Sequence, residues 1–222
     1  MIDKGAGRAW HIGVRVTKVP DGGAKKRLLD AAEALVAAKG FDSVSVRDVT
    51  GAAGANVAAV NYHFGSREGL MDMVAARILE PLCAARTEAL ESAGKSTEAL
   101  VRAYVAALPL VASAIGMDET VFPRLAGRIL ALPDEALPPV LAAARRDVGT
   151  RYMDAVAKTA KAKASDWGLF EAGIAQSLIA VTDSGQMGAL LEDWIAFGVR
   201  GLASTVSPKK KKQDSQGMLF EF

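Results

Sequence analysis

Apolar side chains recur at helical spacing from residue 28 onward, and the first apolar face is followed by a clear stop signal. This face comprises Leu28, Ala32, Leu35 and Val36. Intervals of three and four residues place apolar side chains on one side of an α-helix. The cation Lys39 followed by Gly40, which readily takes the left-handed conformation, predicts the end of this helix.

Two shorter helices are predicted directly after it. Ser45 and Asp48 have the spacing of a capping box, in which each side chain accepts from the backbone N–H of the other, and they predict a helix over about 46–53. Gly54 ends that helix, and Asn56 is a suitable N-cap for a third helix over about 57–64. Two short helices joined by a Gly-containing turn predict a helix-turn-helix.

The third helix has few side chains that can pack against a core. Val60 and Phe64 share one face and are expected to point inward. The outward side chains are then Val57, Ala58, Asn61 and Tyr62. Small side chains let a helix enter the major groove of DNA, and an Asn amide can pair bidentately with adenine. We therefore predict that this helix reads DNA.

Further helical segments are expected along the rest of the chain. They are 67–81, continuing past a kink at Pro81, and then 97–113, 119–132, 135–159, 166–181 and 187–204, with breaks at Pro133-Asp134 and at 182–188. The chain is 50% hydrophobic and 6% aromatic, and helix formers outnumber strand formers. The expected fold class is therefore all-α.

Charge is distributed unevenly, although the formal net charge is only +2. Residues 1–70 carry ten Lys and Arg against seven Asp and Glu, residues 71–207 thirteen against sixteen, and residues 208–222 four against two. A basic N-terminal part suits a nucleic-acid partner. We divide the chain into a disordered basic arm (1–23), a helix-turn-helix DNA-binding domain (24–70), a helical regulatory and dimerisation domain (71–206) and a basic disordered tail (207–222).

Residues 25–74, KKRLLDAAEALVAAKGFDSVSVRDVTGAAGANVAAVNYHFGSREGLMDMV, resemble the DNA-binding domain of the tetracycline-repressor-like (TetR) family of bacterial transcription regulators. The resemblance includes the Gly-Phe after the first helix, the Ser-Val-Arg-Asp start of the second and the segment YHFGSREGL. It implies an all-α homodimer that binds a double-stranded DNA operator and whose remaining helices bind a small-molecule effector. Two positions depart from the family pattern: Val57 stands where a Lys, Arg or Gln is frequent, and Asn61 where a Tyr is common.

The residues expected to contact DNA lie on the helix-turn-helix and at the helix starts around it. They are Lys25, Ser45, Val46, Arg47, Asn56, Val57, Ala58, Ala59, Asn61, Tyr62, His63 and Arg67. Asn61 is expected to read a base, and Val57 and Ala59 to contact thymine methyl groups. His63 is expected either to contact backbone phosphate or to order the helix. Arg67, at the start of the fourth helix, is expected to meet a phosphate.

The family resemblance also implies an effector pocket and a dimer interface in the C-terminal part. The candidate polar anchors of the pocket are Arg86, Tyr104, Arg124, Arg128 and Gln176. The alternative for each is an ordinary solvated Arg or a satisfied buried side chain. The candidate dimer residues are Phe170, Gly173, Ile174, Ser177, Leu178, Leu191, Trp194 and Phe197. The alternative is that these residues form the core of a single chain.

Several other classes of function are excluded by residue counts. Cys83 is the single cysteine and His11 and His63 are the only histidines, so no zinc-ligand spacing and no Ser-His-acid set is present. We therefore expect no metal, no cofactor and no enzymatic activity, and we interpret Cys83 as a packing residue rather than a redox sensor. No apolar run reaches the roughly 18 residues of a membrane span, and the N-terminal segment lacks the apolar stretch of a secretion signal. The expected location is the cytoplasm.

The combined prediction is a ligand-responsive, sequence-specific DNA-binding regulator, by default a repressor that a small molecule releases from its operator. A transcriptional activator of the same fold is one alternative. Another is a helical adaptor that binds a protein through its tail, because 216–220 resembles the short Gln-x-x-Leu-Phe motif that docks on the sliding clamp of DNA polymerase. The basic side chains Lys4, Arg8, Arg15 and Lys18 of the N-terminal arm either add non-specific DNA affinity or belong to an inert extension.

Overall fold

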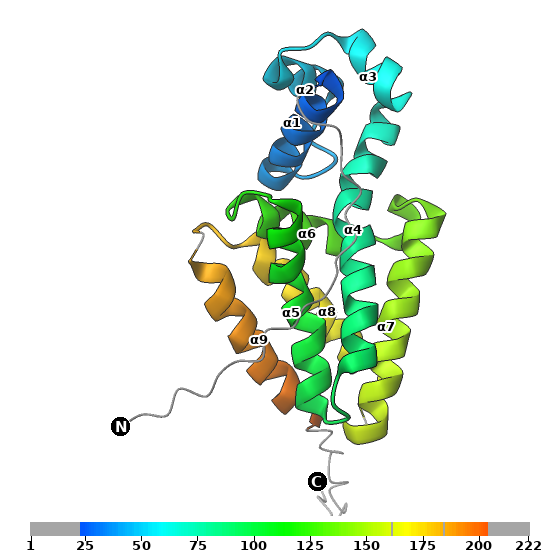
Figure 1. The fold of residues 1–222 in the computed structure, drawn as a ribbon, viewed down its shortest axis with the longest axis vertical. Coiled ribbons are helices and arrows are strands. Elements are labelled where there is room, and N and C mark those ends of the chain that lie inside the picture. The colour runs from blue at the N-terminus through cyan, green and yellow to red at the C-terminus, as the bar shows by residue number, and fades with distance from the viewer. Residues whose placement is uncertain (1–22, 161, 184, 204–222) are drawn as a thin grey trace, which may run out of the picture.

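The computed structural model describes residues 23–160, 162–183 and 185–203, and within these ranges all regular secondary structure is helical (Figure 1). The predicted all-α class, with an N-terminal helix-turn-helix domain followed by a helical domain, is confirmed. The N-terminal arm and the C-terminal tail, with His11 and the clamp-like motif, lie outside the described residues.

Three helices form the N-terminal unit: α1 (Ala24–Lys39), α2 (Val46–Ala53) and α3 (Val57–Phe64). The last two begin and end where the sequence predicts. Between them Gly54 has a φ of 60°, a left-handed conformation that glycine takes at little cost. The small core of this unit includes Leu28, Leu29, Val49 and Val60, all fully buried. Apolar packing therefore fixes α3 with one side inward and the other free.

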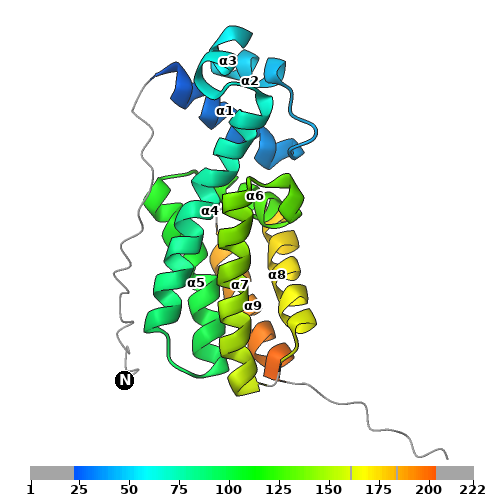
Figure 2. The same ribbon diagram turned by 90° about the vertical axis from the view of Figure 1, so that its right-hand side faces the viewer.

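The remaining elements are α4 (Arg67–Ser92), α5 (Thr97–Ile115), α6 (Val121–Leu130), the 3-10 turn η1 (Asp134–Ala136), α7 (Pro139–Ala160), α8 (Ala164–Ile179) and α9 (Gln186–Ala203). Figures 1 and 2 show that α4 runs from the N-terminal unit down into a bundle formed with α5, α7, α8 and α9. The short helix α6 lies between α1 and the bundle (Figure 1). One continuous helix thus connects the helix-turn-helix to the bundle.

Several predicted helix boundaries differ from the structure, and two of these differences have a local cause. The helix predicted over 119–132 is shorter because the Asp118 carboxylate accepts from the backbone N–H groups of Thr120 and Val121 and holds the chain in a turn there. The helix predicted over 135–159 is two elements, η1 and then α7 from Pro139. A proline fits the first turn of a helix but restricts the residue before it, so the Pro138-Pro139 pair separates the two.

Helix α5 is the one described helix that is long and apolar enough, by length and composition, to cross a membrane. This differs from the expectation that no segment would qualify, because Pro109 does not interrupt the helix. Its side chains Leu100, Val101, Val105 and Leu108 are buried in the bundle. The core helix of a water-soluble protein passes the same test.

Candidate nucleic-acid interface and internal cavity

Three side-chain caps position the helix-turn-helix. The Asp48 carboxylate accepts from the backbone N–H of Ser45 at 2.9 Å while the Ser45 hydroxyl accepts from Asp48 N–H at 3.2 Å, which completes the predicted capping box. Asn56 Oδ1 accepts from Ala59 N–H at 3.0 Å and Ser66 Oγ from Gly69 N–H at 3.1 Å. The hydrogen bonds from Ser45 lower the pKa of Asp48. Each helix start near the candidate DNA surface is therefore fixed by a bond within its own first turn.

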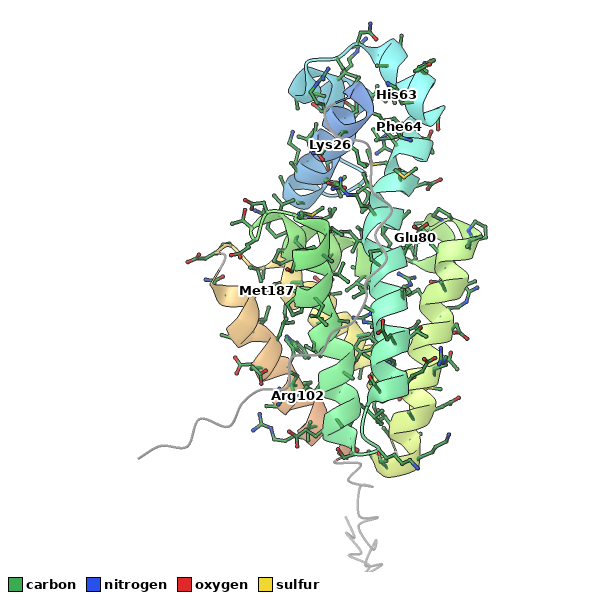
Figure 3. The ribbon with its side chains drawn as sticks, viewed as in Figure 1. Lys26, His63, Phe64, Glu80, Arg102 and Met187 are labelled. Carbon is green, nitrogen blue, oxygen red and sulfur yellow. The ribbon has the colours of Figure 1, made fainter. Side chains whose placement is uncertain are left out.

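The outward side of α3 carries the side chains that the sequence places there. Tyr62 is 85% exposed and Val57 46% exposed, and Ala58 and Asn61 are also exposed, whereas Val60 is fully buried. These side chains are small except for Tyr62, so the helix is narrow enough on this side to enter the major groove of DNA. Figure 3 places His63 and Phe64 of α3 at the opposite end of the molecule from Arg102. The candidate reading surface is therefore at one tip of the molecule.

The other candidate DNA contacts surround this surface with different degrees of exposure. Ser45, Arg47 and Asn56 are exposed, while Lys25, Val46, Ala59 and His63 are half-buried. Lys25 places its ammonium 5.8 Å from the centre of the Phe64 ring. The His63 ring lies 4.9 Å from that of Tyr62. Arg47 is the one cation on α2, and it lies exposed two residues after the N-cap Ser45.

Arg67 has an internal role that sequence reasoning missed. Its guanidinium donates to the carbonyl oxygen of Val44 at 2.9 Å and to that of Phe41. These bonds join the start of α4 to the segment between α1 and α2. The side chain is therefore committed at least in part to holding the domain together, and its phosphate contact stays a prediction.

A partly buried ion cluster between α1 and α4 is a second feature that the sequence did not indicate. Arg77 Nη1 lies 3.1 and 3.2 Å from the two carboxylate oxygens of Glu33 and 3.3 Å from Asp30. Lys26 also contacts Asp30, at 2.7 Å. Burial raises the pKa of Glu33 to about 7, although the charge of Arg77 acts in the opposite direction. This cluster ties the helix-turn-helix unit to the helix that enters the bundle.

The bundle contains a cavity of about 520 Å³ between α7 and α8. It is lined by residues of α4, α5, α6, α7 and α8, with apolar walls that include Leu130, Met153 and Ile174. Three of the five predicted pocket residues line it: Arg86, Tyr104 and Gln176. A volume in this range is typical of small-molecule sites.

The other two predicted pocket residues lie elsewhere. Arg128 donates from Nε to the carbonyl oxygen of Ala37 at 3.1 Å and from Nη2 to that of Ala38 at 3.2 Å, so it caps the C-terminal turn of α1. Arg124 is half-buried on α6 and does not line the cavity. Arg128 is thus a link between α6 and the helix-turn-helix unit rather than a pocket anchor.

The polar side chains of the cavity are organised around Tyr104. The Arg86 guanidinium carbon lies 3.5 Å from the centre of the Tyr104 ring, and Arg86 Nε donates to the Tyr104 carbonyl oxygen at 3.2 Å. The Tyr104 hydroxyl donates to Glu171. Burial raises the pKa of Tyr104 well above its ordinary value, so the ring stays neutral. Glu171 and Trp167 line the same cavity, and sequence reasoning missed both. Glu171 is 67 residues from Tyr104 in the sequence, so no local pattern indicates that the two side chains are in contact.

Comparison with known proteins identifies the N-terminal unit. Residues 28–74 match the family model of bacterial regulatory proteins, tetR family. The match covers the three helices of this unit and the start of α4. A search of curated proteins finds no match to the sequence.

Solved structures of bacterial regulators share the fold of 79–85% of this chain. The regulator PfmR from Thermus thermophilus is 22% identical, with a TM-score of 0.59 over 79% of this chain and 98% of that chain. AmtR from Mycobacterium smegmatis is 17% identical, with a TM-score of 0.58 over 85% and 90%. A tetR-family regulatory protein from Rhodococcus RHA1 is 19% identical, with a TM-score of 0.53 over 82% and 97%. These likenesses show that the chain has the fold of these regulators.

Four of the eight candidate dimer residues on α8 and α9 are buried within the single chain. Phe170, Ile174, Leu178 and Leu191 have at most about 5% of their surface exposed in the single chain, where they form part of its core, and their place in a dimer interface stays a prediction. They pack inward because α8 and α9 bury one face each against α5 and α6. Gly173, Ser177 and Trp194 are half-buried, and Gly173 leaves room for the Trp194 ring.

The outward faces of these two helices carry other residues. Leu169 on α8 is 74% exposed, and Ala172, Gln176 and Ala180 continue the same side at helical spacing. On α9 the predicted residue Phe197 is half-exposed. The surface available to a second chain therefore follows Leu169 and Phe197 rather than the larger apolar side chains beside them.

Cys83 is half-buried on α4, and burial raises the pKa of its thiol. A raised pKa keeps a thiol protonated and poorly nucleophilic. No group of three His, Cys, Asp or Glu residues suited to a metal ion is present among the described residues.

Proposed function

We propose that this chain is a sequence-specific DNA-binding regulator that responds to a small-molecule effector and acts by default as a repressor in the cytoplasm. The observation that carries the proposal is the outward side of α3, where Asn61 is exposed beside small side chains on a helix fixed by caps. Such a helix fits the major groove, and an exposed Asn is a donor and acceptor pair for adenine.

In this proposal the DNA contacts divide into base readers and phosphate contacts. Asn61, with Val57 and Ala59, reads bases, and Arg47 and Lys25 approach phosphates. Ser45 is the exposed N-cap of α2, and the N-terminus of a helix favours anions such as a DNA phosphate. Residues 24–70 serve as the DNA-binding domain and 71–206 as the regulatory domain.

The proposed regulatory step uses α4 and α6. Helix α4 begins at the helix-turn-helix and contributes Arg86 to the cavity, and α6 contributes Leu130 to the cavity while Arg128 holds the end of α1. A ligand that favours one arrangement of these helices changes the separation of the two readers in a dimer. Coupling of about 1–3 kcal/mol, typical of allosteric proteins, changes DNA affinity by roughly 5- to 150-fold.

Repression is the default sense because a dimer bound over a promoter obstructs the polymerase. A homodimer is required because one short helix reads too few bases for specificity, and two half-sites lie about 34–36 Å apart. The outward faces of α8 and α9 are the proposed dimer surface.

The test is selection of bound sequences from random double-stranded DNA, followed by affinity measurements on three variants. Asn61→Ala is expected to relax selection at one base position and to cost about 1–3 kcal/mol on the selected site. Arg47→Ala is expected to weaken all sequences alike and to reduce the salt slope by about one for each protomer. Lys95→Ala removes an exposed cation between α4 and α5 and is the matched control, with unchanged affinity.

The proposal has clear ways to fail. If no sequence is enriched, the chain does not read DNA by sequence. If Asn61→Ala selects the same operator with the same affinity, the reading face is assigned wrongly. If Lys95→Ala weakens binding as much as Arg47→Ala, the effect is one of total charge rather than of the proposed surface.

A further inference from the structure

An apolar groove lies between the end of α4 and the start of α5. Ser92 and Arg102 are the polar residues of its lining, and the other lining residues are five alanines, Gly94 and Leu110. A polar molecule finds few hydrogen-bonding groups in such a groove, whereas an apolar side chain leaves no polar group unpaired there. The lining therefore favours an apolar occupant.

The size of this groove matches one phenyl ring. Its volume is about 150 Å³. An apolar cavity of roughly 150 Å³ in a protein interior is large enough to bind benzene. A Cβ on Gly94 would lie 3.3 Å from the Ala99 side chain, so the glycine helps to keep the space between the two helices open.

Residues 204–222, which lie outside the described residues, include two phenyl rings. Phe220 and Phe222 stand there beside Met218 and Leu219, after four lysines at 209–212. Contact with water is unfavourable for apolar side chains, and contact with other apolar groups is favourable. These side chains are therefore candidates for the groove.

Helix α9 brings the start of this segment close to the groove. Arg102 Nη1 in the groove lining lies 3.0 Å from Glu192 Oε1 on α9, and a Cβ on Gly198 would lie 3.0 Å from Val101. Figure 1 shows the end of α9 beside the start of α5, at the end of the molecule away from the helix-turn-helix. Phe220 follows the last described residue of α9 by 17 positions, which span up to about 56 Å. A ring of this segment can therefore reach the groove without full extension of the chain.

The N-terminal arm fits the groove less well. It joins α1, where Lys25 lies 5.8 Å from the Phe64 ring, before the start of α4. From there α4 rises about 33 Å to Ala89 in the groove. Trp10 stands 14 positions before α1, a span of at most about 46 Å, so it reaches the groove only in a largely extended conformation. Its indole is also larger than a benzene ring.

We propose that residues 218–222 dock on their own chain, with one of their two phenyl rings in the groove between α4 and α5. A segment of the same chain has an effective concentration in the millimolar range, so a small apolar contact is enough to hold it. Leu219 and Phe220 also belong to the Gln-x-x-Leu-Phe pattern at 216–220, and docking withholds them from a protein partner. The inference goes beyond the proposed function and does not depend on DNA binding.

The first experiment measures the burial of both rings by fluorine NMR on the full chain labelled with fluorophenylalanine. Phe220→Leu and Phe222→Leu assign the two resonances. The resonance of a fluorine in contact with water shifts between H2O and D2O, and that of the fully buried Phe122 is the internal reference for a ring without this shift. We expect at least one of the two assigned resonances to lack the solvent shift. A full solvent shift at both rings overturns the proposal.

The second experiment fills the groove. Ala103→Leu places a larger side chain in it, and Ala114→Leu makes the same change at an exposed position of α5 that does not line it. The solvent shift is expected to return in Ala103→Leu and to stay absent in Ala114→Leu, with circular dichroism showing that both variants are folded. Ala106→Leu, one turn further along the groove, replaces Ala103→Leu if that variant does not fold. A ring that stays buried with the groove filled packs elsewhere, and the proposal is then wrong.

Protein concentration distinguishes a contact within one chain from a contact between copies. The occupancy of a contact within one chain does not change on dilution, so we expect the same spectrum after about tenfold dilution. Burial that is lost on dilution places the segment on a second molecule and overturns the contact within the chain.

Discussion

Glu33 places a carboxyl group in the packed interface between α1 and α4, where Arg77 is its partner. Burial in low dielectric disfavours the carboxylate more than Arg77 favours it, so the pKa rises to about 7 from an ordinary value of 4.5. Near neutral pH the side chain thus takes up a proton that it lacks in the unfolded chain.

The pH dependence of stability follows from this shift. Between about pH 4.5 and 7 the folded state binds a proton at Glu33 and the unfolded state does not, so stability increases as pH falls through this window. The full shift corresponds to at most about 3 kcal/mol, at roughly 1.4 kcal/mol for each pKa unit. Urea unfolding at pH 5 and pH 7.5 measures it.

Glu33→Gln supplies the control for this pH dependence. The amide keeps the shape and can still accept from Arg77, but it does not titrate. The variant is expected to lose most of the gain in stability between pH 7.5 and pH 5. An equal gain in both proteins would show that other groups are responsible.

Residue-scale features differ in how far sequence reveals them. The caps at Ser45 and Asn56 were predicted correctly because each bond spans three residues of one chain segment. The contact between Glu33 and Arg77 spans 44 residues and depends on how α1 packs against α4. No local pattern distinguishes such a glutamate from a solvated one.

At the scale of elements, the effect of a proline or a glycine on a helix depends on how that helix packs against its neighbours. Pro81 and Pro109 lie inside α4 and α5 without ending either helix, whereas Pro139 begins α7. Neighbouring helices stabilise the first two helices by burying their apolar faces. Sequence therefore predicts where helices lie better than it predicts whether a proline interrupts them.

Two helical glycines are expected to respond oppositely to alanine. Apart from its chain neighbours and the backbone of its own helix, no atom lies within 4 Å of a Cβ added at Gly51. Gly51→Ala is therefore expected to stabilise α2 by about 0.5–1 kcal/mol through helix propensity. At Gly127 the Cβ would lie 2.5 Å from the Ala175 carbonyl oxygen, where α6 and α8 meet. Gly127→Ala is expected to destabilise by about 1–3 kcal/mol.

Urea unfolding of both glycine variants at one pH measures this difference. Each variant is the control for the other, because both make the same chemical change within a helix. If Gly127→Ala is as stable as the parent chain, α6 and α8 are not in close contact in solution. If Gly51→Ala destabilises, α2 is not a regular helix at that position.

At the scale of the whole molecule, the two candidate sites were predictable to different degrees. The reading face lies on one short helix with strong local signals, so its exposed side chains match the prediction. The cavity is assembled from five helices, and the sequence predicted three of its lining residues but not Trp167 or Glu171. Half of the dimer candidates are large apolar residues that the fold of the single chain uses for its own core.

The dimer surface gives the last prediction. Leu169 on α8 and Val140 on α7 are exposed apolar side chains of similar accessibility, 74% and 78%. In a two-fold symmetric dimer built on α8 and α9, Leu169 of each chain lies in the interface and Val140 does not. Leu169→Asp therefore places a charge in the interface of each chain, and Val140→Asp places one in water.

Sedimentation at micromolar concentration is expected to show a dimer for the parent chain and for Val140→Asp, and a monomer for Leu169→Asp. Operator affinity is expected to fall at least tenfold for Leu169→Asp, because a monomer engages only one of two half-sites. Phe197→Asp on α9 is expected to behave like Leu169→Asp if both helices contribute. A dimer that persists in Leu169→Asp and Phe197→Asp but dissociates in Val140→Asp would place the interface on α7 instead.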